Sequence, residues 1–214
     1  MKLSEFILYS VILAVGAVIY NDMNKMPEPS KINSYSYSSV SDMPEQTNTD
    51  ADEFEIKNAD GVFKIEPLYD YKMTAMVMSR YNYDWGWDGN LVPVDLALAW
   101  GDLPKTEYTE KVQYWQSGRW YYYRYKDFPL GKSYIISHSA NNHILPANET
   151  IKEALRKLEK RRIVRLEGYL INLEGNVKGK KVTWTTSETR EDSGDHSCEL
   201  FYVNKLVVGD KIYI

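Results

Sequence analysis

The sequence predicts an α+β domain with a largely antiparallel sheet and about two helices, preceded by an apolar helix at the N-terminus. Three observations support this fold class. Alternating apolar and polar residues recur in about eight short segments separated by turn residues. One later segment repeats apolar residues at the helical spacing of three and four. The chain begins with a long uncharged stretch, residues 6–20.

That uncharged stretch predicts contact with a membrane. A bilayer core of about 30 Å needs about 20 helical residues, and the apolar region of a signal peptide is shorter than that. Residues 15–17 are small enough for a cleavage site, whereas Glu5 and the bulky residues 18–20 favour an uncleaved helix. We therefore expect residues 1–20 to be a membrane anchor, with a cleaved signal segment as the alternative.

The segment after the apolar stretch differs in composition from the rest of the chain. Residues 21–52 are rich in Ser, Pro, Asn and Asp and show neither helical nor strand periodicity. Such a segment buries too little apolar area to offset the entropy of ordering. The sequence thus predicts a disordered tether over residues 21–52 and a globular α+β domain over residues 53–214.

The first half of that domain predicts two hairpins and a helix. One hairpin joins Phe54–Lys57 to Val62–Ile65 through Asn58–Gly61, and a strand over Tyr69–Ser79 follows. Pro93 near the start and Gly101 just past the end predict a short helix over the residues between them. The second hairpin is expected around Ser117 and Gly118, from the ranges Lys111–Gln116 and Trp120–Tyr125.

The second half predicts a capped helix and four strands. Asn148 can cap a helix that runs from Glu149 to about Arg161. Its apolar face consists of Ile151, Ala154, Leu155 and Leu158. Strands are expected over Ser133–Ser137, Ile163–Asn172, Val182–Ser187 and Glu199–Val208. The run from 163 to 187 has the pattern of curved strands in a small barrel, so the sheet is either open or closed into such a barrel.

Charge and cysteine content exclude several function classes. The chain has 26 Lys and Arg against 30 Asp and Glu, a net charge of −4. A nucleic-acid-binding surface needs an excess of cations, so no nucleic-acid partner is expected. The single cysteine excludes an intramolecular disulfide framework and a zinc site of four thiolates.

Three stretches of the sequence are distinctive as a set: PVDLALAWG from Pro93, HSANNHILPA from His138, and WTTSETREDSG from Trp184, with Cys-Glu following at Cys198. Together they resemble a family of uncharacterised bacterial membrane-anchored proteins. The resemblance implies a bacterial source, and hence a place in the inner membrane. The short tail before the apolar stretch predicts that the domain faces the periplasm or the cell exterior. The resemblance carries no catalytic residues, because the family has no assigned activity, and it implies a small residue where this chain has His196.

The histidines and the cysteine are the candidate catalytic residues. His138, His143, His196 and Cys198 have the residue types of a tetrahedral zinc site, but their spacing is not that of a known zinc motif, so neither metal nor cofactor is expected. Cys198 as nucleophile, with His138 or His143 as base and Asn141 or Asn142 as orienting group, is the thiol alternative. Against it, the acidic neighbours Asp195 and Glu199 oppose thiolate formation, and a cysteine at the start of an apolar strand fills core volume.

Two aromatic groups are candidate binding surfaces. Trp85 and Trp87 lie in a loop with Asp84, Asp88 and Asp95, a composition suited to sugar binding as well as to packing on a sheet. Strand alternation places Trp120 and Tyr122 on one face of the second hairpin, where aromatic side chains are typical of interfaces.

A basic run lies at the end of the predicted helix 149–161 and just beyond it. It is made of Arg156, Lys157, Lys160, Arg161, Arg162 and Arg165. The run suits a solvated helix end, or a surface that docks on anionic lipid or an acidic partner.

Two functions remain open from the sequence. The first is a membrane-tethered extracytoplasmic domain that binds a protein or a component of the cell envelope. The second is a metal- or thiol-dependent enzyme that uses His138, His143 and Cys198. The enzyme requires Cys198 and a histidine to lie within about 4 Å of each other, or of a common point, in an open cleft.

Overall fold

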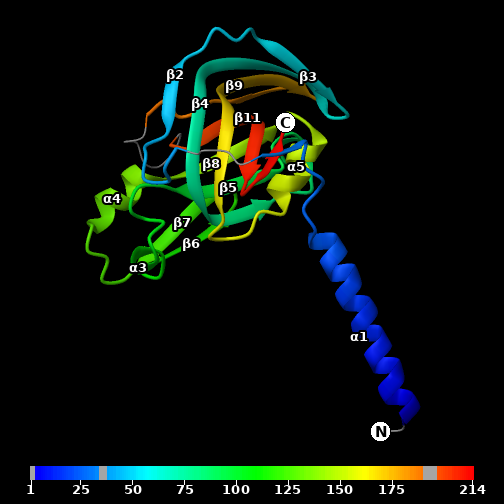
Figure 1. The fold of residues 1–214 in the computed structure, drawn as a ribbon. Coiled ribbons are helices and arrows are strands. Elements are labelled where there is room, and N and C mark those ends of the chain that lie inside the picture. Colours follow the sequence, from blue (N-terminus) through cyan, green and yellow to red (C-terminus); the bar gives the residue numbers. More distant parts are fainter. Residues whose placement is uncertain (1–2, 34–37, 190–196) are drawn as a thin grey trace.

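A computed structural model describes residues 3–33, 38–189 and 197–214. Five strands form its centre (Figure 1). The long strand β4 (Gly61–Asn82) pairs with both β5 (Val94–Ala99) and β9 (Ile163–Val177). β5 pairs with β8 (Ser139–Pro146), and β8 runs parallel to β11 (Glu199–Val208).

The pairing of β11 with β9 closes these five strands into a barrel. All neighbours in the ring are antiparallel except β8 and β11. The ring order β4-β5-β8-β11-β9, with a helix between β8 and β9, is the strand order of the OB-fold, a Greek-key barrel of five strands. The predicted α+β class is thus confirmed, and the sheet closes into a small barrel. Of the run 163–187 that predicted a barrel, residues 163–177 belong to the ring and residues 180–184 lie outside it.

The barrel interior is the main hydrophobic core. Alternate residues of every barrel strand point inward, for example Met73 of β4, Leu96 of β5 and Phe201 of β11, each 2% exposed or less. Helix α5 (Glu149–Arg156) adds Ile151, Ala154 and Leu155 to this core. Asn148 caps α5 as predicted, its Oδ1 accepting from the Ile151 amide at 3.0 Å.

An insertion between β5 and β8 covers part of the outer face of the barrel. It contains α3 (Thr106–Thr109), a hairpin of β6 (Val112–Ser117) and β7 (Trp120–Tyr125), and α4 (Gly131–His138). Val112, Tyr114 and Phe128 pack on Ala97 and Ala99, two of the outward residues of β5. Figure 1 shows this insertion gathered on one side of the barrel. Outward side chains of β5 and β8 are therefore buried as completely as inward ones.

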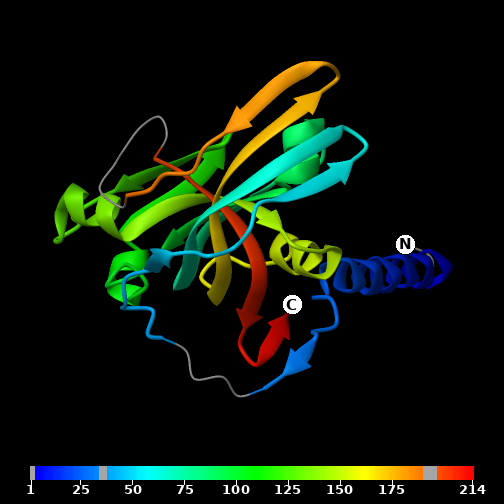
Figure 2. The same ribbon diagram turned by 90° about the horizontal axis from the view of Figure 1, so that it is seen from above.

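Two hairpins extend the sheet beyond the barrel. β3 (Phe54–Asn58) pairs with the start of β4, and β10 (Lys180–Trp184) pairs with the end of β9. Because Gly61 of β4 opposes Val177 of β9, the two hairpins lie side by side, as Figure 2 shows. With the short helix α2 (Gly86–Leu91), they enclose a second hydrophobic cluster around Phe63.

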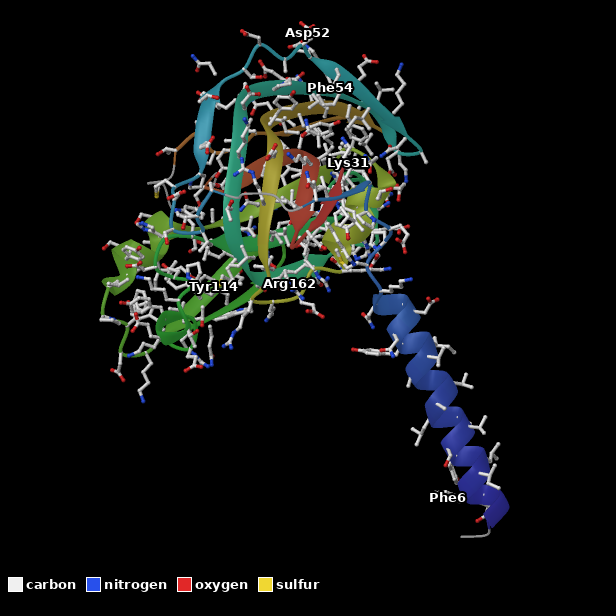
Figure 3. All side chains as sticks on the ribbon, viewed as in Figure 1. Phe6, Lys31, Asp52, Phe54, Tyr114 and Arg162 are labelled. Atoms are coloured by element: carbon white, nitrogen blue, oxygen red, sulfur yellow. The ribbon has the colours of Figure 1, made fainter. Side chains whose placement is uncertain are left out.

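The N-terminal helix α1 (Leu3–Asn24) projects from the domain (Figure 1). Its segment Glu5–Asn24 is 20 residues long and apolar enough to cross a membrane, and none of that segment is buried. The helix thus continues past Tyr20, and it reaches the length that residues 6–20 alone lack. In Figure 3 its side chains, Phe6 among them, point into open space.

Two predicted elements are wrong. The helix expected between Pro93 and Gly101 is strand β5, because this strand lies between β4 and β8 and is buried on both faces, so it shows no alternation. The strand expected over Ser133–Ser137 belongs to helix α4. Short apolar runs do not distinguish a buried strand from a helix by periodicity.

Residues 21–52 were predicted to be disordered, but parts of this segment that the structure describes form strands paired with the domain. β1 (Lys31–Ile32) pairs with β12 (Lys211–Tyr213), and β2 (Glu45–Asn48) pairs with β4. Between them, Val40 accepts a hydrogen bond from the Gly101 amide at 2.9 Å. Pairing to distant strands gives this polar segment backbone partners that its own composition does not reveal.

We therefore expect a chain that begins at residue 53 to be less stable than one that begins at residue 25. The shorter chain loses the β2 ladder and the contact of the Trp100 Nε1 atom with the Met43 sulfur at 3.2 Å. The lost backbone and side-chain contacts are worth about 1–3 kcal/mol in total. Urea unfolding of both chains measures the difference in stability. Equal midpoints would mean that residues 25–52 do not stabilise the domain, as predicted for a tether.

Candidate functional site

A row of polar side chains lies on the outer face of the barrel, beneath the β6–β7 hairpin. Asp95 on β5 is directly opposite His143 on β8, and Ala97 is opposite Asn141. Side chains at opposed positions share a face, so Asp95, His143 and Asn141 point the same way. Cys198, just before β11, completes the row, because its Sγ lies 3.7 Å from the Asn141 Nδ2.

Asp95 is the centre of this network and is completely buried. Its Oδ1 lies 2.9 Å from both the His143 Nδ1 and the Arg119 Nη1, and its Oδ2 accepts from the Tyr83 hydroxyl at 3.0 Å. A buried carboxylate is tolerated only with such partners. Three groups from three different segments thus hold one carboxylate in place.

Arg119 is positioned by the turn between β6 and β7. The residue adopts a positive φ of 70°, and its side chain is 17% exposed. The Arg119 guanidinium donates to the Asp88 Oδ2 at 3.0 and 3.2 Å, and it lies 3.5 Å from the centre of the Tyr83 ring. Ion pairs to two carboxylates tie the covering hairpin to β5 and to α2.

His143 is held between Asp95 and Cys198. Its Nδ1 faces Asp95, which leaves Nε2 for the thiol, and its ring lies 4.8 Å from the Trp184 ring. Burial lowers the pKa of His143, but the hydrogen bonds to Asp95 and Cys198 and the charge of Asp95 outweigh it and raise the pKa to about 9. The imidazole therefore carries a proton at neutral pH.

Cys198 lies at the wall of an open cleft of about 340 Å³. The cleft is lined by Arg119, Trp120, His143, Thr183, Trp184, Thr185 and Cys198. The interpretation of Cys198 as a buried core residue is thus wrong, since its side chain is half-buried and borders this cleft. Strand alternation places Glu199 on the opposite face, with Phe201 and Val203 of the barrel interior. Asp195 and His196 lie outside the described residues.

His138 is not part of this arrangement. It ends α4, five residues before His143, which corresponds to roughly 15 Å along β8. Its ring stacks on Tyr134 at 3.8 Å, and its Nδ1 lies 2.8 Å from the Ser137 hydroxyl. Burial lowers the pKa of His138 below its ordinary value. Of the two histidines proposed as bases, the structure brings only His143 to the cysteine.

Among the described residues, no group of three or more His, Cys, Asp or Glu side chains is arranged to hold a metal ion. The zinc site considered from the sequence also includes His196, which lies outside the described residues.

The aromatic candidates separate into different places. Trp120 lines the cleft beside Cys198. Trp87 stacks on Phe63 at 5.7 Å in the second hydrophobic cluster, whereas Trp85 is 81% exposed. Tyr122 lies on the outer face of the hairpin, and its ring stacks on the exposed Trp115 at 5.7 Å.

The pairing of Asp95 with His143, and the roles of Arg119 and Trp184, were not foreseen from the sequence. One signal was present: Asp95 is the only charged residue in the apolar run 93–100. A lone carboxylate in a buried run must have a specific partner. The identity of that partner depends on strand register, which the sequence does not reveal.

No protein-family model, curated protein or solved structure matches the chain. The site is therefore interpreted from its own geometry.

The raised pKa of His143 predicts how stability depends on pH. Folding raises this pKa from 6.5 to about 9, so the bound proton stabilises the folded state fully below pH 6.5. That contribution is lost as the pH rises through about 9. At about 1.4 kcal/mol per pKa unit, the loss is about 3 kcal/mol. Urea midpoints between pH 6 and pH 10 measure it, and His143→Gln should flatten the curve. Stability that is constant over this range in the wild type would contradict the assignment.

Proposed function

We propose that the protein is a membrane-anchored, thiol-dependent enzyme in which Cys198 is the nucleophile. One observation carries the proposal. On the outer face of the barrel Cys198 contacts His143 and His143 contacts Asp95, and the thiol lies at the wall of an open cleft. A nucleophile, a base and a group that orients the base are the parts of a catalytic triad.

Each residue has a role that its contacts support. The Asp95 carboxylate accepts from the His143 Nδ1 and fixes the tautomer and the ring orientation. Protonated His143 is in hydrogen-bond contact with Cys198, so its charge stabilises the negative charge that develops on the sulfur when it reacts. Arg119 and Tyr83 keep Asp95 in place, so they act as positioning residues.

The reaction class that fits is acyl transfer. In the reacting form the proton of Cys198 resides on His143, and the sulfur attacks the carbonyl carbon of an ester, thioester or amide to form a carbon–sulfur bond. His143 then gives this proton to the leaving oxygen, sulfur or nitrogen as the bond to the acyl carbon breaks. Water next attacks the acyl carbon and gives a proton to His143, the carbon–sulfur bond breaks, the acid leaves, and Cys198 and His143 return to their starting state. The side-chain amide of Asn141 is a candidate donor for the oxyanion, because its Nδ2 lies 3.7 Å from the Cys198 sulfur while it also donates to the Arg119 carbonyl at 2.9 Å.

The cellular setting follows from α1 and from the resemblance. The exposed apolar segment Glu5–Asn24 is long enough to cross a membrane, and the bulky residues 18–20 favour an uncleaved anchor over a signal segment. The similarity of the three sequence stretches supports membership of a bacterial membrane-anchored family. We place α1 in the inner membrane and the domain in the periplasm or at the cell exterior, where a cell-envelope component is the expected substrate or partner.

A binding domain without catalysis is the second candidate. OB-fold barrels commonly bind ligands on an outer face and at the adjoining loops, and this analogy concerns the fold alone. Here the corresponding surface carries the cleft, with Trp120 and Trp184 in its walls. Indole faces suit flat sugar rings or aromatic side chains. In this alternative Cys198 is a wall residue with no chemistry.

Incubation of the full chain with p-nitrophenyl acetate, followed by intact-mass analysis, separates the two functions. The enzyme should gain one acetyl group on its single cysteine and release more p-nitrophenol than one equivalent per chain. Cys198→Ala should abolish both, while a matched Cys198→Ser variant should retain at most a small fraction. An acetyl adduct that forms no faster in the folded than in the urea-unfolded chain would leave the binding domain as the better description.

A further inference from the structure

We infer that the loop after α5 binds the anionic lipid surface in which α1 is anchored. This basic loop, residues 157–162, contains Lys157, Lys160, Arg161 and Arg162 with a single acid, Glu159. The inference rests on the proposed membrane anchor, and it is independent of the chemistry at Cys198.

The loop lies at the end of α1 where the chain leaves the helix. The Lys157 Nζ donates at 2.6 Å to the carbonyl of Lys25, which is the first residue beyond α1. A hollow of about 270 Å³ is bordered on one side by Asn24 and Met26 and on the other by Lys157 and Arg162. Met26 also packs against the main core, which fixes this junction to the domain.

This position sets the height of the loop above the bilayer. The apolar span ends at Asn24, so Lys25 lies at the level of the headgroups when α1 crosses the membrane. A group in hydrogen-bond contact with Lys25 is then well within the Debye length of about 8 Å from the lipid phosphates. At that distance the charge of the loop acts on the membrane surface with little screening.

The cations of the loop are available for this contact. Lys160, Arg161 and Arg162 are exposed, and in the described part of the chain only Arg162 has an ion pair, with Glu159 at 3.3 Å. The backbone holds the loop in place, because the Arg161 amide donates to the Val77 carbonyl at 2.7 Å and the Val77 amide donates to the Arg162 carbonyl at 2.9 Å. The charges are thus presented by a fixed turn at the end of β4.

An aromatic side chain borders the same surface. Trp115, 46% exposed, shares a hollow of about 420 Å³ with Lys160 and Arg161. Tryptophan favours the membrane–water interface, where its apolar ring and its N–H are both accommodated. In Figure 3, Arg162 lies between Tyr114 of β6 and the domain end of α1, so hairpin, loop and anchor form one continuous border.

The charges near the loop favour an anionic bilayer over an acidic protein. The two hollows are lined by three acids and by five cations, so the cations are in excess; the acids are Glu110, Glu159 and Asp210, and the cations are the four of the loop with Lys211. A lipid surface reaches all of these cations at once, because α1 holds the domain against it. Each exposed cation near an anionic leaflet strengthens binding about fivefold, so neutralising three weakens it about a hundredfold.

The test uses the full chain inserted in vesicles of phosphatidylcholine alone or with about one-third phosphatidylglycerol. Amide hydrogen exchange of residues 157–163 should slow at least tenfold when phosphatidylglycerol is present, and high salt should reverse the protection. The triple variant Lys160→Gln, Arg161→Gln and Arg162→Gln should exchange equally in both vesicles. Resistance of the chain to alkaline extraction from the vesicles tests the anchor separately.

The matched control neutralises Lys178, Lys180 and Lys181 at the β9–β10 turn. That turn lies at the far end of the 15-residue strand β9, up to about 45 Å from the loop along the chain direction. These substitutions should leave the protection of the loop unchanged. Equal exchange of the wild-type loop in the two vesicles, with α1 inserted, would overturn the inference. Protection that appears in both vesicles only after an acidic protein is added would assign the loop to a protein partner and would equally overturn it.

Discussion

Replacing Asp95 with alanine is expected to lower the free energy of unfolding by about 3–5 kcal/mol. The change removes the common partner of Arg119, His143 and Tyr83 while leaving these groups in place. His143 is 4% exposed and would then be a buried cation without its carboxylate. Breaking a buried charge network by deleting one member costs far more than the network itself contributes.

Urea unfolding at pH 7 measures this effect against a matched surface substitution. Glu55→Gln removes the partner of Lys57 in an ion pair that is more than half exposed, and it should change stability by less than about 1 kcal/mol. Asp95→Asn should fall between the two, because the amide retains the shape and one acceptor. A cost below about 1 kcal/mol for Asp95→Ala would mean that the network does not hold the site together.

Replacing His143 with glutamine is expected to slow alkylation of Cys198 at least about tenfold at pH 7. The protonated imidazole of His143 is in hydrogen-bond contact with the Cys198 thiol, so it stabilises the negative charge that develops on the sulfur during alkylation. The side chain of glutamine can hydrogen-bond but carries no positive charge. The variant also keeps Arg119 and Tyr83 on Asp95, so it should remain folded at 25 °C.

His138→Gln is the control for this experiment. His138 stacks on Tyr134 at the end of α4 and is absent from the lining of the cleft. Its replacement should leave the alkylation rate of Cys198 unchanged. Iodoacetamide modification followed by mass measurement reports a single site, because the chain has one cysteine. Equal rates in the two histidine variants would remove His143 from the proposed mechanism.

Much of the fold was accessible from local sequence signals. The hairpin turns and the Asn148 cap depend on residues within a few positions of each other, and they were predicted correctly. Helix α5 begins where predicted but ends at Arg156, five residues before the predicted end at Arg161. Residues 163–177, part of the run predicted to form a small barrel, are strand β9, which pairs with both β4 and β11. Strand β5 was mistaken for a helix because the hairpin insertion buries its outer face. No residue of β5 itself indicates that another segment covers this face.

The candidate site could be predicted only in part, for the same reason. The sequence identified His143 and Cys198 as residues capable of chemistry, but 54 positions separate them, and their contact depends on the parallel pairing of β8 with β11. It also offered His138 on equal terms. Which histidine faces the thiol is decided by strand register, since a shift of one residue reverses the face of every side chain.

The measurement that tests the proposed role of Cys198 most directly is its alkylation rate in the folded chain and in the same chain unfolded in urea, at pH 6.5. A thiol activated by His143 should react several-fold faster in the folded protein, even though folding half-buries it, and the advantage should shrink as the pH approaches 9 and His143 loses its proton. Slower reaction in the folded chain at pH 6.5, with a rate that simply rises with pH as for an ordinary thiol, would contradict the proposed catalytic site.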